Sequence, residues 1–370
     1  MLATGRSPLD RRPRSGFLPA ALALAAAAAL ACQTAGPAAP SKAPQPEHPA
    51  ASAAAPAPAP SRPEPRPGLR ASAPLPPGSV VELQSLRAEV EGVLRGDAAW
   101  SRLRAAGEAS AAPEGEEYLL VRLKLTGAGS RSVVGCKDFR VTGSDRVAHF
   151  HAPQLLPEAL EARILAAGES AEGWCIYSIP TDERGLILML SEPDSRDPAG
   201  LRYLALEEGA ALADPPPAPG LPAEPVGISA RDPAPPGREV VTRDWSVNAL
   251  EILRGDGATK LVASASGTNP PPADGHEFVA VKLHARYFGR EGEPGLFSAA
   301  QFKAVSGDEK PYETPLVLDL EPGLPKTLLP GGEYTGWAVF QVARGDARAV
   351  LRFRPYYPDD GLRYLALAGD

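Results

Sequence analysis

The amino-acid sequence predicts an all-β protein that contains two tandem β-sandwich domains. The first observation is a heptapeptide, Gly-Leu-Arg-Tyr-Leu-Ala-Leu, which occurs at residues 200–206 and again at 361–367. The second is an alternation of apolar and polar side chains over short segments, which is typical of strands with one buried face. The third is the placement of glycine and proline between these segments, which is typical of the turns in sandwiches. Together the three observations predict two copies of one strand-rich unit.

The N-terminus has the composition of an export signal. Arginines among the first 14 residues precede an uncharged run, rich in alanine and leucine, at 17–31. This run is short and rich in alanine for a membrane-spanning helix, so we interpret residues 1–31 as a signal peptide. The small residues before Cys32 resemble a bacterial lipoprotein signal, in which the cysteine carries the lipid. The alternative is a plain signal peptide that is cut nearby, with Cys32 incidental.

Residues 32–79 are rich in proline and alanine and contain few large aliphatic side chains. Such a segment cannot bury enough apolar surface to offset the entropy lost on ordering, so we expect a disordered tether. A lipid on Cys32 would then make the membrane the first partner of the chain. We predict a place in the bacterial cell envelope. The outer membrane is favoured because Gln33, and not the aspartate that often retains lipoproteins at the inner membrane, follows Cys32.

The two repeats are expected at residues 80–209 and 237–370, with a proline-rich linker at 210–236. Residues 93–97, Val-Leu-Arg-Gly-Asp, correspond to Ile-Leu-Arg-Gly-Asp at 252–256. Small changes in the spacing between matching motifs indicate insertions and deletions in loops. Because the linker is rich in proline and stiff, we expect the two domains to have separate cores.

Period-two alternation marks the strands of each repeat. Apolar residues alternate with polar ones at 119–125, and the pattern returns at 279–285. The Gly-Trp segments at 173–179 and 336–342 are also interpreted as strands. Residues 80–94 allow a short helix, but their copy reads as strand, so we expect strand in both. Further strands are expected at 186–190, at 350–353 and in the two heptapeptides.

Several motifs recur in the same order within each repeat. A strand that ends in Leu-Arg-Gly-Asp precedes a Gly-x-Glu-[Tyr/Phe] strand, then a turn after Phe139 or Phe302, then a Gly-Trp strand. This order resembles the immunoglobulin-like domain of unknown function that is common in bacterial lipoproteins. That domain is similar in fold to a mycobacterial secreted immunoprotective antigen. The resemblance covers both repeats and implies two immunoglobulin-like sandwiches. It transfers no catalytic residue, because the family carries none that is established.

The three cysteines suggest one lipid and one disulfide. If Cys32 is lipidated, Cys136 and Cys175 remain as a pair. Each is replaced by alanine 163 positions later, at Ala299 and Ala338. Joint replacement indicates that the two sites touch, and an exported compartment would oxidise them, so we predict a Cys136–Cys175 disulfide. The alternative is a pair of unrelated buried thiols.

Other candidate chemistry is sparse. His149 and His151 flank one residue and would share a strand face, a spacing that can begin a metal site. No third ligand is evident nearby and the second copy lacks the pair, so we interpret them as a solvated strand face. We predict no metal and no cofactor. Trp174 and Trp337 are interpreted as core anchors rather than as a sugar-stacking platform.

The functional prediction is a non-enzymatic protein-interaction module with an unidentified envelope partner. The chain lacks a nucleophile elbow, a phosphate-binding loop, a dinucleotide fingerprint and a His-Glu-x-x-His motif, so we predict no catalytic residues. The net charge of −7 and the pI near 5.5 argue against a nucleic-acid partner. The alternative is a small-ligand or ion-binding envelope protein that uses the acidic loops at 192–197 and 358–361.

Overall fold

The structure is a computed structural model, and strands dominate it. The signal peptide, Cys32 and most of the two acidic loops fall outside the residues that it describes. The described residues are 67–107, 110–129, 132–152, 156–191, 200–290, 292–356 and 361–368. Within these ranges the all-β prediction is confirmed. None of the helices there is long and apolar enough to cross a membrane.

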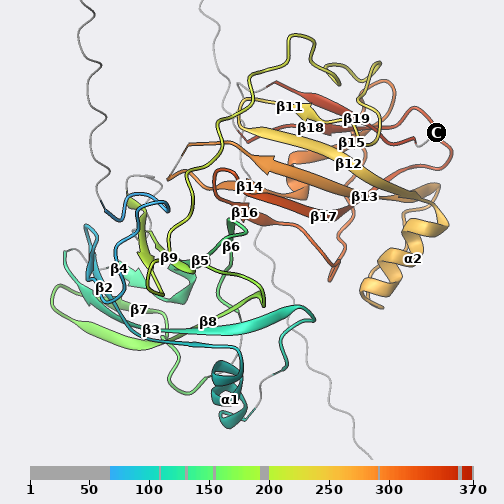
Figure 1. Cartoon of the computed structure of the whole chain (residues 1–370). Helices are drawn as coiled ribbons and strands as arrows, with labels where there is room; N and C mark the ends of the chain where they lie inside the picture. The colour runs from blue at the N-terminus through green and yellow to red at the C-terminus, as the bar shows by residue number, and fades with distance from the viewer. Residues whose placement is uncertain are drawn as a thin grey trace, which may run out of the picture. The chain divides into compact units, whose positions relative to one another are not determined.

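The two halves of the chain present their elements in nearly the same order (Figure 1). The first half contains β1 (Val81–Glu82), β2 (Leu86–Arg95), α1 (Asp97–Ala105), β3 (Glu116–Gly127), β4 (Ser132–Val134), β5 (Phe139–Thr142), β6 (Val147–Ala148), β7 (Arg163–Leu165), β8 (Ser170–Pro180), β9 (Ile187–Leu190) and β10 (Arg202–Ala205). The second contains β11 (Val240–Val241), β12 (Trp245–Arg254), α2 (Asp256–Ala265), β13 (His276–Tyr287), β14 (Gly295–Phe297), β15 (Phe302–Val305), β16 (Lys326–Leu328), β17 (Glu333–Ala343), β18 (Val350–Phe353) and β19 (Arg363–Ala366). Among the described residues, β6 alone has no strand as its counterpart.

Each repeat is a sandwich of antiparallel strands. In the first repeat a sheet in the order β1-β2-β3-β8 faces a sheet in the order β10-β9-β5. The second repeat has the equivalent sheets β11-β12-β13-β17 and β15-β18-β19. The apolar positions of the alternating segments all point inward, as predicted. They are fully buried at Leu119, Val121, Leu123, Leu125, Val279, Val281, Leu283 and Ala285.

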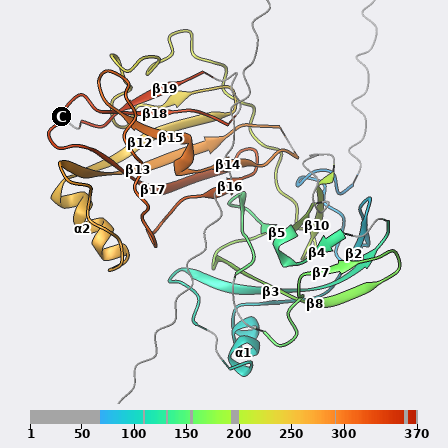
Figure 2. The same ribbon diagram turned by 180° about the vertical axis from the view of Figure 1, so that it is seen from behind.

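A helix covers the outer face of the larger sheet in each repeat, and the sequence did not predict either helix. In Figures 1 and 2, α1 lies on the side of β3 and β8 that faces away from β5. Its residues Ala99 and Leu103 pack against Trp174 and Ile176 of β8 in an apolar cluster outside the main core. Trp174 and Trp337 are 6% and 8% exposed, so both are anchors of this outer layer.

A glycine with positive φ turns the chain from strand to helix in both repeats. Gly96 has φ 58° and Gly255 has φ 55°, values that L side chains rarely adopt. A Cβ at Gly96 would also lie 2.7 Å from Oε2 of Glu117. The Leu-Arg-Gly-Asp motif therefore ends a strand and begins a helix at Asp97 or Asp256.

Residues that precede the expected boundaries at 80 and 237 form backbone hydrogen bonds with each repeat. The amide of Tyr203 in β10 donates to the carbonyl of Gly68, at 2.9 Å. The amide of Tyr364 in β19 donates to the carbonyl of Gly227, at 2.7 Å. Residues assigned by composition to the tether and the linker thus pair with the last strand of each sandwich.

β6, a short strand of the first repeat, pairs with a strand of the second repeat. β6 runs antiparallel to β16, with Ala148 opposite Thr327 and Val147 opposite Leu328. The amide of Leu329 donates to the carbonyl of Arg146, at 2.8 Å. The main cores are distinct clusters, and Val147 belongs to the cluster of the second repeat.

Candidate functional site

Cys136 and Cys175 form a disulfide that links β8 to the segment just before β5. Cys136 lies in a short 3₁₀ helix before β5, and Cys175 lies in β8. Their Cα atoms are 5.4 Å apart, within the usual range for a disulfide. Their counterparts occupy equivalent places: Ala299 lies in the matching 3₁₀ helix and Ala338 lies in β17.

An ion pair explains why arginine and glutamate recur in the motifs of both repeats. In the first repeat, Nε of Arg95 donates to Glu117 at 2.6 Å, and its Nη2 donates to the carbonyl of Glu183 at 2.8 Å. In the second, Nη2 of Arg254 donates to Glu277 at 2.7 Å and to the carbonyl of Asp346 at 3.1 Å. Each arginine therefore joins its own strand to the neighbouring strand and to the loop after the Gly-Trp strand. This role is structural.

The structure does not bring His149 and His151 into one site. His149 pairs through its backbone with Val141, and its Nε2 lies 3.2 Å from Oδ2 of Asp145. His151 forms a bridge with β8 instead, and its Nδ1 lies 3.0 Å from the carbonyl oxygen of Ile176. The two imidazoles therefore contact different groups.

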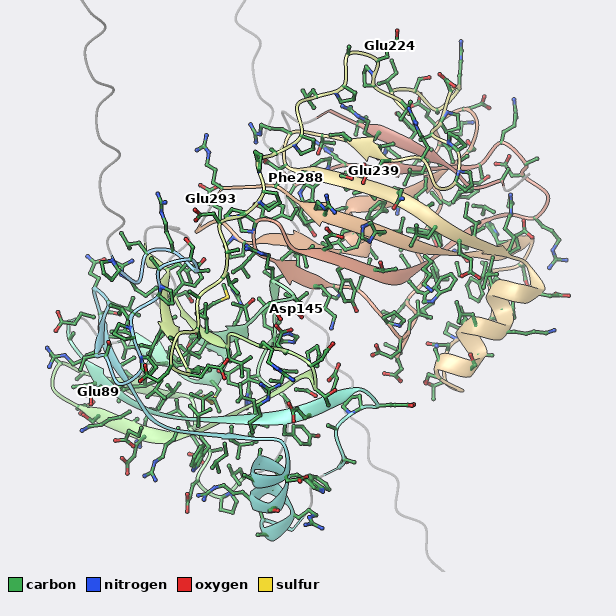
Figure 3. All side chains as sticks on the ribbon, viewed as in Figure 1. Glu89, Asp145, Glu224, Glu239, Phe288 and Glu293 are labelled. Atoms are coloured by element: carbon green, nitrogen blue, oxygen red, sulfur yellow. A yellow bond between two sulfur atoms is a disulfide. The ribbon has the colours of Figure 1, made fainter. Side chains whose placement is uncertain are left out.

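His149 instead lies close to two carboxylates, one four residues before it and one far along the chain. Asp145, labelled in Figure 3, lies in the turn between β5 and β6, and Glu183 lies between β8 and β9. One potential ligand atom from each of Asp145, His149 and Glu183 lies within 4.8 Å of the others. We call these three residues the first-repeat triad. The sequence did not predict this grouping, because Glu183 comes 34 positions after His149.

Glu183 is the buried member of the triad, with 2% of its surface exposed. Its Oε1 accepts a hydrogen bond from the hydroxyl of Ser144 at 2.8 Å and another from the amide of Asp145 at 3.0 Å. Burial raises the pKa of the Glu183 carboxyl, and the nearby Asp145 carboxylate raises it further. The hydrogen bonds from the Ser144 hydroxyl and the Asp145 amide act in the opposite direction and lower this pKa in part.

The second repeat has a different set of residues at the same three positions. Asp308, Tyr312 and Asp346 lie 163 positions after the members of the triad. The Tyr312 hydroxyl donates to Oδ2 of Asp346, at 2.6 Å. A phenol thus replaces the imidazole and satisfies the acidic side chain directly.

The two-stranded ribbon of β4 and β7 presents an apolar, open edge. Val133 and Ile164 lie opposite each other in this ribbon and are 43% and 57% exposed. Among the described residues no strand pairs with the other edge of β7. In the equivalent ribbon of β14 and β16, β6 occupies that edge. The edge of β16 is therefore covered by a strand, and the equivalent edge of β7 is not covered by any described strand.

A cavity of about 380 Å³ lies beside Trp337 in the second repeat. Ala299 and Ala338, which stand where the first repeat has its disulfide, are part of its lining. The acidic loops at 192–197 and 358–361 lie almost entirely outside the described residues, so ion binding there stays a prediction.

No known family description and no curated protein matches the chain. A search of solved structures returns several chains of low identity. One is a candidate lipoprotein of Bacillus subtilis, ycdA, with 13% identity and a TM-score of 0.28 over 35% of this chain and 38% of that one. Another is the secreted protein MPT63 of Mycobacterium tuberculosis, with 11% identity and a TM-score of 0.26 over 36% of this chain and 97% of that one. A third is an uncharacterised β-sandwich protein of Clostridium difficile, with 9% identity and a TM-score of 0.24 over 36% and 95%. Each of these structures overlaps about a third of this chain, at 9–13% identity.

Proposed function

We propose that the protein is a lipid-anchored, non-enzymatic module of the cell envelope that captures an extended segment of a partner protein at β7. The observation that carries this proposal is the open, apolar edge of β7, whose counterpart β16 is covered by β6. The anchor at Cys32 rests on the sequence alone.

The edge has the features of a strand-addition site. An unpaired edge offers a row of backbone donors and acceptors, and natural proteins usually protect such edges with charge, proline or a covering segment. Arg163 is charged, but the next residue, Ile164, is among the most exposed large apolar residues of the described chain. Binding by strand addition uses these backbone groups for affinity and the alternate side chains for specificity.

The second repeat indicates which backbone groups would pair. The amide of Leu329 bonds to the carbonyl of Arg146, so this amide points toward the edge that β6 covers. Because peptide groups alternate between the two edges of a strand, the amide of Thr327 points the same way. Ile164 stands 163 positions before Thr327. Its amide is therefore the expected donor to an incoming strand.

The expected occupant is a strand from another protein and not from a second copy of this chain. Within the chain, β6 is already engaged by β16. Its counterpart in the second repeat, Lys310-Pro311, contains a proline that lacks an amide donor. Neither copy of this segment is thus suited to reach β7 of a neighbouring molecule. By analogy with Val147 and Ala148, the partner segment should carry small apolar residues.

Site-specific photo-crosslinking in intact cells tests the proposal. A photoreactive amino acid at residue 164 should give an adduct with a second protein. The matched control places the same probe at residue 327, where β6 should be captured within the chain. An adduct of the mass of two copies of this chain would refute the choice of occupant. Absence of any intermolecular adduct at residue 164, or equal labelling from the exposed Leu250 of the second repeat, would refute the site.

A further inference from the structure

We propose that the first-repeat triad, Asp145, His149 and Glu183, binds a single divalent transition-metal ion of the zinc class. This site is independent of the β7 edge. It would give the first sandwich a bound ion that the second lacks.

The donor set suits such an ion. Zinc accepts imidazole nitrogen and carboxylate oxygen, whereas calcium and magnesium favour sites made of oxygen alone. Ligands about 2.0–2.2 Å from zinc in tetrahedral geometry lie about 3.3–3.6 Å from one another. Nε2 of His149 and Oδ2 of Asp145 are 3.2 Å apart, close to that spacing. The ligand atom of Glu183 lies within 4.8 Å of both, so the three donors are grouped closely enough to share one ion.

The state of Glu183 points independently to a missing ligand. Its side chain is 98% buried, and both of its hydrogen bonds reach Oε1. Among the described residues, none donates to Oε2, and no lysine or arginine side chain pairs with this carboxylate. Buried charges in proteins are paired with opposite charges or coordinate metal ions. A cation in the triad would supply the missing compensation.

Local structure holds the ligands in place without an ion. Oδ1 of Asp145 accepts from the amide of Val147 at 2.8 Å, which leaves Oδ2 to face His149. The backbone of His149 exchanges two hydrogen bonds with Val141. Gly143 makes room for the carboxylate, since a Cβ there would lie 2.3 Å from Oε1 of Glu183. Ligands fixed in this way lose little freedom on binding an ion.

The coordination that results is incomplete. Three protein ligands leave a fourth position, which water or a group from a partner could fill. Side chains of the triad are 10% exposed at His149 and 28% exposed at Asp145, so an ion can enter from solvent. The Ser144 side chain beside them is on the exposed surface.

The second repeat supplies a natural control. At its equivalent positions, the Tyr312 hydroxyl already satisfies Asp346, and no imidazole is present. The substitution His149→Tyr therefore copies an arrangement that the same fold tolerates 163 positions later.

The test is calorimetric titration of the metal-stripped full chain with zinc chloride, with thermal unfolding as a second readout. We expect one equivalent of zinc to bind and the melting temperature of the chain to rise. His149→Tyr should weaken zinc binding by at least about 100-fold. Removal of a residue that only supports a metal ligand already weakens binding by up to about 100-fold, and His149 is proposed to be a ligand itself. The variant should leave the circular dichroism of the apo chain unchanged. Tyr312→Phe is the matched control and should bind zinc as the wild type does.

Three outcomes would overturn the proposal. The first is no binding at millimolar zinc. The second is equal binding by wild type and His149→Tyr, which would place the ion on another surface group. The third is a preference for calcium over zinc that survives His149→Tyr. Glu183→Gln tests whether Glu183 coordinates zinc or is only a buried protonated carboxyl. Loss of zinc binding by this folded variant supports coordination, and unchanged binding excludes Glu183 as a ligand.

Discussion

Removal of the Cys136–Cys175 disulfide should destabilise the first repeat and leave the second unchanged. The double variant Cys136→Ala/Cys175→Ala opens a crosslink between residues 39 positions apart. In the chain-entropy account, a loop of this length contributes about 4 kcal/mol. The fold itself should survive, because the second repeat already has alanine at both equivalent places.

Hydrogen exchange followed by mass spectrometry can report on each repeat separately. Amides of β3 that exchange only on unfolding of the first repeat should lose about three orders of magnitude of protection, since each 1.4 kcal/mol is a factor of ten. Amides of β13 should keep theirs. Both single variants should cost about as much as the double variant, because either one removes the crosslink. Equal loss of protection in β3 and β13, or no loss at all, would refute the reasoning. So would two free thiols in protein taken from its native compartment.

Three further predictions concern the anchor, the domain boundary and the motif ion pair. Cys32→Ala should move the protein from the membrane fraction to the soluble fraction; retention with membranes in high salt would rule out the lipid. A fragment that starts at Gly227 should melt cooperatively and at a higher temperature than one that starts at Pro235, because the Gly227 carbonyl accepts the Tyr364 amide; equal melting temperatures would contradict this boundary. Arg254→Met should lower the free energy of unfolding by about 1–3 kcal/mol in chemical denaturation, because it strips a half-buried Glu277 of its charged partner; a loss below about 0.5 kcal/mol would mean that the pair is only a surface contact.

The sequence predicted the strands best where buried and exposed side chains alternate regularly along the chain. Alternation over 119–125 and 279–285 placed the central strands correctly, because every second side chain there is fully buried. The helices at Asp97–Ala105 and Asp256–Ala265 escaped notice. Each is short and buries only two residues, Ala99 and Leu103 in α1, so its apolar period is weak. The turn that starts each helix depends on a positive φ at glycine, which composition alone does not reveal.

The triad and the inter-repeat strand lay beyond sequence reasoning for a different reason. Asp145 and Glu183 meet only because the loops that follow β5 and β8 lie side by side at one end of the sandwich. One signal was available: acids recur 163 positions later as Asp308 and Asp346, while His149 changes to tyrosine. β6 has two residues, too few for any period, and its partner strand belongs to the other repeat.

The measurement that tests the central claim most directly is the effect of Ile164→Pro on capture of the partner found by crosslinking. Proline removes the amide expected to bond the incoming strand, and an edge strand tolerates proline where that amide faces solvent. We expect Ile164→Pro to have the same melting temperature as the wild type and to lose the partner. The control variant Leu250→Lys should keep the partner. Undiminished capture by a folded Ile164→Pro variant would contradict strand addition at β7.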